Sequence, residues 1–303
     1  MDNIGNHILT SQGNQFQIDQ LLSQRKLYTY AKRLQLILIL ITVLVPVVLV
    51  YIIKSIPEME IEKNWLFALY SVVAFFLECF IEIKIAKYKK TAASIQEKFD
   101  IHVLKIEENE MLLTSIVGPE IIRDLSLKLR SDNKAVEKVL NWYSLNISEI
   151  KSNLATLLCQ RTNINYDLRL RKKYYIIIIS LLVIPFVSLL AIFLFNNVGL
   201  KDIVIEVFLP CIPIFVFTWK ELYTNYESIN ELEHISMLID EKFKSLTSDS
   251  TLENVFLRKI QDRIFINRTA NPLIPDWFYN LIRSKSEDTM NYSVIQKTAD
   301  LSN

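Results

Sequence analysis

The sequence predicts an all-α membrane protein, with four transmembrane helices in two hairpins and a mainly helical cytoplasmic domain. Three observations support this fold class. Hydrophobic residues make up 51% of the 303-residue chain, and its mean hydropathy is +0.23. These apolar residues gather in four separate runs instead of recurring evenly along the chain. Basic residues stand beside the runs on one side only, as the positive-inside rule describes for membrane proteins.

The four apolar runs have the lengths expected of membrane spans, for which about 20 predominantly apolar residues are needed. They are residues 34–54, 65–86, 174–196 and 202–219. The first and third are almost purely apolar, and each contains one proline, which a membrane helix tolerates as a kink. The second carries Glu78 and Glu82, and the shorter fourth carries Glu206.

The orientation follows from the basic residues that flank the runs. They are Arg25, Lys26, Lys32 and Arg33 before the first; Lys84, Lys87, Lys89 and Lys90 at the end of the second; Arg169, Arg171, Lys172 and Lys173 before the third; and Lys220 after the fourth. The connections within the two hairpins hold few basic residues. The positive-inside rule therefore predicts a multi-pass protein whose N- and C-termini are both cytoplasmic.

The remaining sequence is expected to be cytoplasmic and mostly helical. It comprises an N-terminal segment 1–33, a helical region 87–173, C-terminal helices 220–290 and a disordered tail 291–303. Pro119 is expected to open a helix, because its missing N–H costs little in a first turn. A long helix from residue 149 is expected to continue into the third span. The rough alternation at 99–106 also allows a short strand.

Three acidic residues within the runs, Glu78, Glu82 and Glu206, admit two interpretations. Because ionisable groups inside a bilayer are costly, one interpretation is that these carboxylates form a polar seam that lines a pore or joins subunits. Alternatively, Glu82 and Glu206 lie near the two membrane interfaces and extend their carboxylates towards water.

Aromatic and basic residues occur together in the cytoplasmic segments, around Trp142 to Arg169 and around Arg258 to Arg268. Stacking aromatics and guanidinium groups suit a nucleotide ligand, which combines bases with phosphates. Basic residues near a membrane surface are equally expected from topology and from contacts with lipid headgroups.

The sequence gives no support for an enzyme. Four glycines are too few for a glycine-rich phosphate-binding loop, and the three histidines are far apart. The three cysteines form no CxxC pair and are expected to be reduced packing residues. We therefore expect no catalytic residues, no metal and no cofactor, and the net charge of +1 predicts no DNA partner.

Four stretches together resemble the SMODS-associated four-transmembrane effectors of bacterial anti-phage (CBASS-type) signalling. They are QLLSQRKLYTYAKRLQ (20–35), EKFDIHVLKIEENE (97–110), WYS (142–144) followed by LCQRTNINYDLRLRKKY (158–174), and LRKIQDRIFINRTANPLIPDWFYNLIRSKSED (257–288). Their order around two hairpins is that of the family, and the resemblance covers most of the chain. The last stretch is the most specific.

The resemblance implies an effector in the bacterial inner membrane. A functionally linked nucleotidyltransferase would make a cyclic oligonucleotide, and the cytoplasmic part of the effector would bind it. The spans would then rearrange or homo-oligomerise among the membrane lipids and permeabilise the membrane, so that the infected cell stops growing. Chemistry and position within the family motifs select the candidate ligand-binding residues: Arg161, Asn165, Tyr166, Arg169, Arg263, Arg268 and Trp277.

Two other functions remain open from the sequence. One is a small channel or transporter, although four spans with few polar residues leave little room for a substrate site at the midplane. The other is a membrane-anchored scaffold that recruits a soluble partner through the cytoplasmic helices.

Overall fold

The computed structural model describes residues 3–46, 48–49, 63–112, 117–148, 150, 152–195, 199, 209–246 and 250–302. Over these residues all regular structure is helical, and the all-α class is confirmed. The elements are α1 (Ile4–Gln12), α2 (Gln15–Ile39), the π-helical turn η1 (Leu40–Leu44), α4 (Lys63–Leu104), α5 (Pro119–Arg130), α6 (Asn133–Glu137), the 3-10 turn η3 (Leu145–Ile147), α7 (Leu154–Phe195), α9 (Leu209–Phe243), α10 (Asn254–Ala270) and α11 (Asp276–Ser302).

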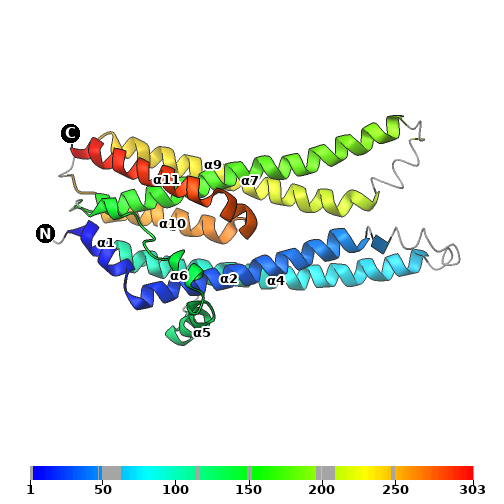
Figure 1. The fold of residues 1–303 in the computed structure, drawn as a ribbon, viewed down its shortest axis with the longest axis horizontal. Helices are drawn as coiled ribbons and strands as arrows, with labels where there is room; N and C mark the ends of the chain where they lie inside the picture. Colours follow the sequence, from blue (N-terminus) through cyan, green and yellow to red (C-terminus); the bar gives the residue numbers. More distant parts are fainter. Residues whose placement is uncertain are drawn as a thin grey trace.

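Two long helical hairpins lie side by side and form the frame of the molecule (Figure 1). Helix α2 packs against α4 in the first hairpin, and α7 packs against α9 in the second. Both hairpins point to the same end of the molecule, while α1 and the end of α11 lie at the opposite end (Figure 1). Helices α1, α10 and α11 widen the end that holds the termini.

The apolar runs continue as helix into the flanking polar sequence. Helices α4 and α7 each extend over 42 residues, and α7 begins at Leu154, close to the position expected from sequence. Over the described residues, no helix combines the length and the apolar character that crossing a membrane requires. Parts of the runs 34–54, 174–196 and 202–219, at residues 47, 50–54, 196 and 202–208, lie outside the described residues.

The largest buried cluster lies at the widened end and joins helices from both hairpins. Fully buried Leu22 of α2, Phe99 of α4 and Ala155 of α7 belong to it, together with Ile8 of α1. A second cluster unites the start of α7 with the end of α9 and with α10, through residues such as Leu157, Ile235 and Ile260. Because apolar burial is the main favourable term in folding, the first cluster holds the two hairpins together, and the second attaches α10 to the second hairpin.

Two local expectations need correction. Residues 99–104 belong to α4, because Phe99 and Val103 lie four residues apart and bury one helical face completely. The helix ends at Leu104, where Lys105 adopts a left-handed φ of 52°. The expected disordered tail 291–303 is helical to Ser302 within α11. Val294 is only 4% exposed within the largest buried cluster, and this packing orders the segment.

The expected helix after Pro119 is confirmed as α5, with Pro119 in its first turn after the N-cap Gly118. This helix packs on α2 through a bidentate ion pair. The Arg130 guanidinium donates to both carboxylate oxygens of Asp19, at 2.8 and 2.6 Å. The Ser23 hydroxyl of α2 also donates to the Ile122 carbonyl at 2.6 Å. Polar contacts of this kind attach α5 to the outside of the first hairpin.

Candidate functional site

A cavity of about 580 Å³ lies between the two hairpins. One wall comes from α2 and α4, and the facing wall comes from α7, α10 and α11. Leu232 of α9, most of the segment 137–144 and the loop 271–274 complete the lining. Its volume falls within the range that is usual for small-molecule sites. The cavity is therefore the natural place for a ligand that contacts both hairpins at once.

Basic side chains outnumber acidic ones in this lining. The basic residues are Arg25, Lys32, Lys89, Lys138, Arg171, Arg268 and Arg283, and the acidic residues are Glu137, Asp167, Asp276 and Glu287. Several of these charges neutralise each other: Lys32 pairs with Asp276 at 2.6 Å, and Arg171 pairs with Asp167 at 3.0 Å. Arg25 forms no ion pair with a described residue. The balance leaves a surplus of positive charge suited to an anionic ligand.

Four aromatic side chains also face the cavity: Tyr28, Trp142, Tyr166 and Tyr279. The Tyr166 and Tyr279 rings lie near each other, with centroids 6.2 Å apart and planes inclined by 58°. Burial raises the pKa of Tyr28 to about 12, so its hydroxyl stays protonated at physiological pH. Aromatic faces beside cations are the combination by which proteins bind bases together with phosphates.

Arg171 is a buried cation of the cavity wall, and only 5% of its surface is exposed. Its guanidinium donates to the Asp167 carboxylate at 3.0 Å and to the Asn225 amide oxygen at 3.2 Å. Asn225 in turn donates to the Arg171 carbonyl at 3.1 Å. These bonds tie α7 to α9 beside the cavity and fix the position of the guanidinium.

The seven candidate residues chosen from the sequence divide into two groups. Tyr166 and Arg268, from different motifs, both line the cavity. The other five do not belong to its lining. Arg161 donates to Asp240 at 2.8 Å and to the Ser293 hydroxyl at 3.0 Å. Asn165 accepts a hydrogen bond from Ser236 at 2.9 Å.

The remaining three candidates lie at other places on the surface or between helices. Arg263 pairs with Glu231, and its side chain is 48% exposed. Trp277 is 59% exposed and meets Phe278 edge to face. Arg169 has one buried guanidinium nitrogen without a hydrogen-bond partner among the described residues. The tertiary structure therefore gathers only part of each motif at the cavity.

Other cavity residues were not chosen from the sequence as ligand contacts. In the sequence, three of them, Arg25, Lys32 and Arg171, were interpreted as basic flanks of the membrane spans. That interpretation explained their charge without indicating that they line a cavity. Trp142 stood out as an aromatic residue near basic ones, but nothing in its spacing placed it beside α2. Tyr28 lies in the first family motif, and that position was the one available signal.

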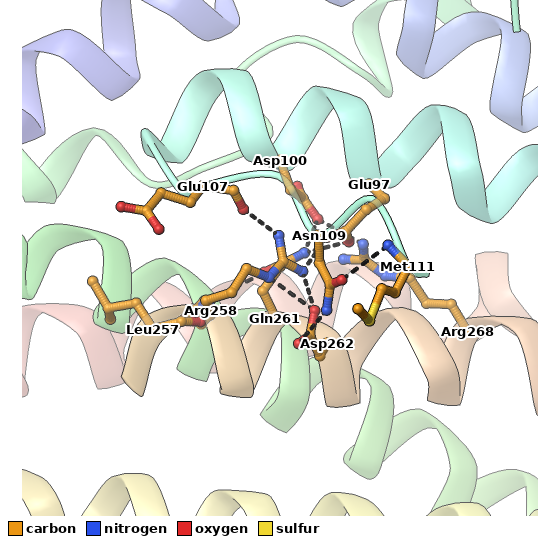
Figure 2. Close-up of polar contacts among 11 residues, drawn as sticks. Glu97, Asp100, Glu107, Asn109, Met111, Leu257, Arg258, Gln261, Asp262 and Arg268 are labelled. Carbon is orange, nitrogen blue, oxygen red and sulfur yellow. Dashed lines mark hydrogen bonds and ion pairs between the residues drawn. The ribbon is translucent and has the colours of Figure 1, made fainter. Parts of the chain in front are cut away.

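A buried polar network connects α4 to α10 next to the cavity (Figure 2). Arg258 pairs with Glu97 at 2.6 Å, and Arg268 pairs with Asp100 at 2.6 Å. Gln261 lies between the two pairs and donates to both carboxylates, at 2.8 and 3.1 Å. Burial raises the pKa of Glu97, and the neighbouring Asp100 raises it further. Each buried carboxylate is thus paired with an arginine, which offsets the cost of burying it.

The network also reaches the segment that lines the cavity. The Tyr143 hydroxyl donates to Asp100 at 2.6 Å, and Asn163 of α7 donates to that hydroxyl at 3.2 Å. Burial, followed by the nearby Asp100, raises the pKa of Tyr143 well above its usual value. Through Asp100, the first hairpin, the second hairpin and the cavity wall share one set of hydrogen bonds.

A second polar group joins the hairpins closer to the apolar runs. The Gln35 amide of α2 donates to Glu221 of α9 at 3.0 Å. Burial raises the pKa of Glu221 to about 7, although the nearby Lys89 lowers it. Burial also lowers the pKa of Lys89 to about 8, while Glu221 opposes that shift. This carboxyl and this amine therefore both change charge close to physiological pH.

The three acidic residues of the expected polar seam differ in their surroundings. Glu82 of α4 pairs with Lys220 of α9 and so links the two hairpins. Glu78 is partly exposed on α4. Glu206 lies outside the described residues. Within the described part of the chain, no group of three or more His, Cys, Asp or Glu side chains is placed to hold a metal ion.

Comparisons with known proteins identify the family of this chain. A model of the SMODS-associating 4TM effector domain matches residues 6–297. A probable CBASS effector molecule of Bacillus cereus (strain VD146) is 27% identical over 286 residues, covering 93% of this chain and 95% of that protein. No solved structure matches this chain significantly. The family match spans almost every helix described above, and the chain belongs to the SMODS-associating 4TM effector family.

Proposed function

We propose that this protein is a ligand-gated effector of anti-phage defence that permeabilises the bacterial inner membrane when a cyclic oligonucleotide binds. Membership of the effector family supports the defence role and a functional link to a nucleotidyltransferase that makes cyclic oligonucleotides. The name of the Bacillus cereus relative, a probable CBASS effector molecule, agrees with this role. The observation that carries the proposal is the basic, aromatic-lined cavity between the hairpins.

The cavity chemistry matches both parts of a cyclic oligonucleotide. Arg25, Lys89 and Lys138 face the cavity and supply positive charge for the phosphodiesters. Burial lowers the pKa of Lys138, and an anion close to its amine would favour the charged form. Trp142 and Tyr28 offer faces on which bases stack. Tyr166 and Arg268 keep their proposed role as ligand contacts.

Among the other candidates, Arg161, Asn165, Arg169, Arg263 and Trp277 act in this proposal through the packing of the helices that shape the cavity. Arg161, for example, attaches α7 to both α9 and α11 through Asp240 and Ser293. Ligand binding that changed the separation of the hairpins would change these contacts as well.

The position of the cavity provides the coupling to the hairpins. A ligand shifts a conformational equilibrium only if it binds one arrangement better than another. The cavity walls come from α2 and α4 on one side and from α7, α10 and α11 on the other. A ligand held by both walls therefore favours one spacing of the hairpins. Because α4 and α7 continue without interruption into the apolar runs, that spacing is transmitted along them.

We assign the apolar runs 34–54, 65–86, 174–196 and 202–219 to membrane spans, with both termini in the cytoplasm. Many large apolar side chains on the described parts of these runs are exposed, among them Phe76 at 67%, Ile83 at 68% and Ile184 at 63%. Exposed apolar surface of this extent is typical of contact with lipid or with another protein. The proposal includes association of several copies within the lipid.

Dye release from proteoliposomes tests this function. The full-length protein is reconstituted with its termini outside and mixed with a panel of cyclic di- and trinucleotides. We expect at least one member of the panel to release the dye, and the Arg25→Ala/Lys138→Ala variant to require much more of it. Lys259→Ala removes an exposed cation of α10 outside the cavity lining and serves as the matched control. Release by no member of the panel contradicts the proposal.

A further inference from the structure

The turn between α10 and α11 lies at the edge of the widened end, facing the part of the molecule in which only the two hairpins continue (Figure 1). Its contacts define its level along the hairpins. Asp276, the first residue of α11, pairs with Lys32 at 2.6 Å. Lys32 stands shortly before the run 34–54. The start of α11 therefore lies level with the start of the first proposed span.

A second set of contacts puts the same turn beside the third run. Phe278 is only 1% exposed, and its ring centroid lies 5.5 Å from that of Tyr174, the first residue of the run 174–196. Ile178, one helical turn further into that run, belongs to the same buried cluster. Leu222, which follows the fourth run, packs against this cluster. Contacts with both hairpins thus agree that the first turns of α11 lie where the proposed spans meet the cytoplasm.

Two large apolar side chains of these turns remain exposed. Trp277 is 59% and Leu281 is 70% exposed, and the two lie four residues apart on one side of α11. Phe278 and Ile282 occupy the side that packs against the protein. The Trp277 indole meets Phe278 edge to face, with centroids 5.8 Å apart. An indole combines apolar rings with one N–H donor, and tryptophan is accordingly enriched at the boundary between acyl chains and headgroups.

From this placement we propose that Trp277 and Leu281 lie in the cytoplasmic interface of the lipid bilayer, so that the membrane surface is the partner of this face. The inference rests on the proposed function, because it requires the apolar runs to span the membrane. Any protein partner would have to reach the face at the level of the lipid headgroups, whereas lipid is already present there. Residues 271–274 of the cavity lining directly precede this turn, so the lipid contact begins at the edge of the ligand cavity.

Brominated phospholipids, which quench tryptophan fluorescence on contact, test this placement on the full-length protein in liposomes. The bromines are attached either just below the headgroup or near the ends of the acyl chains. The chain has four tryptophans, and Trp142 packs against the largest buried cluster, away from the apolar runs. We expect Trp277→Phe to lower the fraction of fluorescence that the shallow bromines quench. Trp142→Phe is the control and should raise that fraction, because it removes an indole that lipid does not reach.

Moving the indole along α11 gives a second readout. Leu281→Trp, added to Trp277→Phe, should restore the quenching by shallow bromines, because position 281 belongs to the same exposed face. Ile295→Trp in the same background is the matched control. Ile295 is 47% exposed but lies about four helical turns beyond Leu281, at the end of the molecule opposite the apolar runs. Its substitution should leave the quenching as low as in Trp277→Phe alone.

The results distinguish this contact from the proposed function. If no tryptophan of the parent protein is quenched, including Trp65 and Trp219 of the proposed spans, membrane insertion and the Trp277 contact are both wrong. If the parent is quenched, but Trp277→Phe and Leu281→Trp leave the quenched fraction unchanged, the lipid contact alone is overturned. A blue-shifted Trp277 emission that bromines do not quench would assign the face to a second copy of the chain and would likewise overturn the lipid contact.

Discussion

Arg263 and Arg268 lie five residues apart on α10 and share a family motif, yet their environments differ completely. Arg263 pairs with Glu231 at the surface, where its side chain is 48% exposed. Arg268 pairs with the fully buried Asp100, and its side chain is 12% exposed. Solvent screens the first pair, whereas loss of one partner from the second leaves a buried charge uncompensated.

This contrast predicts very different stabilities for two alanine variants. Arg268→Ala should lower the free energy of unfolding by about 3–5 kcal/mol, because Asp100 loses its charged partner. Arg263→Ala should change it by about 0–1 kcal/mol. Thermal unfolding followed by intrinsic fluorescence in detergent micelles measures both. Equal shifts in Tm for the two variants would show that the α4–α10 network (Figure 2) does not stabilise the fold.

Glu221 gives the molecule a defined dependence on pH. Burial raises its pKa from 4.5 to about 7, so the folded protein binds more protons than the unfolded chain within that interval. Stability falls with rising pH wherever the folded state holds the extra proton. The contribution of Glu221 to the free energy of unfolding is therefore fully present below about pH 4.5, and it is lost as the pH rises to about 7. Lys89, whose pKa is lowered to about 8, acts in a separate window above that value.

Glu221→Gln should remove the loss of stability between pH 4.5 and 7. Glutamine stays neutral and keeps an oxygen that can accept from Gln35. Unfolding midpoints measured across this interval should fall less steeply for the variant than for the parent protein. Glu231→Gln changes a partly exposed carboxylate on the same helix, which pairs with Arg263, and provides the control. Parallel profiles for Glu221→Gln and the parent would contradict the raised pKa.

At the scale of elements, α1 shows how closely the N-terminal helix approaches the segment before α7. The Gly5 N–H donates to the Ile150 carbonyl at 3.0 Å. A Cβ added at Gly5 would lie 1.9 Å from the Ile147 carbonyl oxygen, which is backbone and cannot turn away. Gly13, at the other end of α1, has no atom closer than 3.5 Å to such a Cβ, and its φ of −77° suits alanine.

Alanine substitutions at these two glycines should have opposite effects. Gly5→Ala should destabilise the protein by roughly 1–3 kcal/mol, as overpacking does, because α1 must move away from η3. Gly13→Ala should be neutral or stabilise it by up to about 1 kcal/mol, since it restricts the unfolded chain. Unfolding in denaturant gives both values. A neutral Gly5→Ala would mean that α1 does not dock on this segment.

At the scale of the whole molecule, the two hairpins share a network, a cavity and a pair of charges near the apolar runs. The pair is Glu82 of α4 with Lys220 of α9. Both side chains are partly exposed, at 41% and 62%, so this contact adds little to overall stability. Its position between the hairpins makes it a probe of their relative movement.

Charge substitution at this pair tests whether hairpin spacing controls permeability. Lys220→Glu places two carboxylates side by side and should increase dye release from proteoliposomes in the absence of ligand. Glu82→Lys/Lys220→Glu restores an opposite pair and should return the release to its basal level. Equal dye release from the single and the double variant would mean that the spacing of the hairpins does not control permeability.

The sequence by itself determined the helical class, the long helices and the family. Helical continuity from the apolar runs into polar sequence follows from local spacing and from the lack of breakers, and α5 follows from Pro119. These features depend on neighbours in the chain, which a sequence displays directly. The sequence did not predict the helical tail of α11, because contacts at Ser293 and Val294 with residues far away in the chain order this polar segment.

The cavity was decided only by the tertiary structure. Its walls join residues from 21 to 291, and no local spacing records that Gln24 and Asn271 line one space. The sequence motifs made Tyr166, Arg268 and Arg263 candidate ligand contacts, and of these three Tyr166 and Arg268 line the cavity. Motif position could not separate Arg268 from Arg263, because both are arginines on one helix. Burial beside Asp100 distinguishes them, and burial arises only when α4 and α10 pack together.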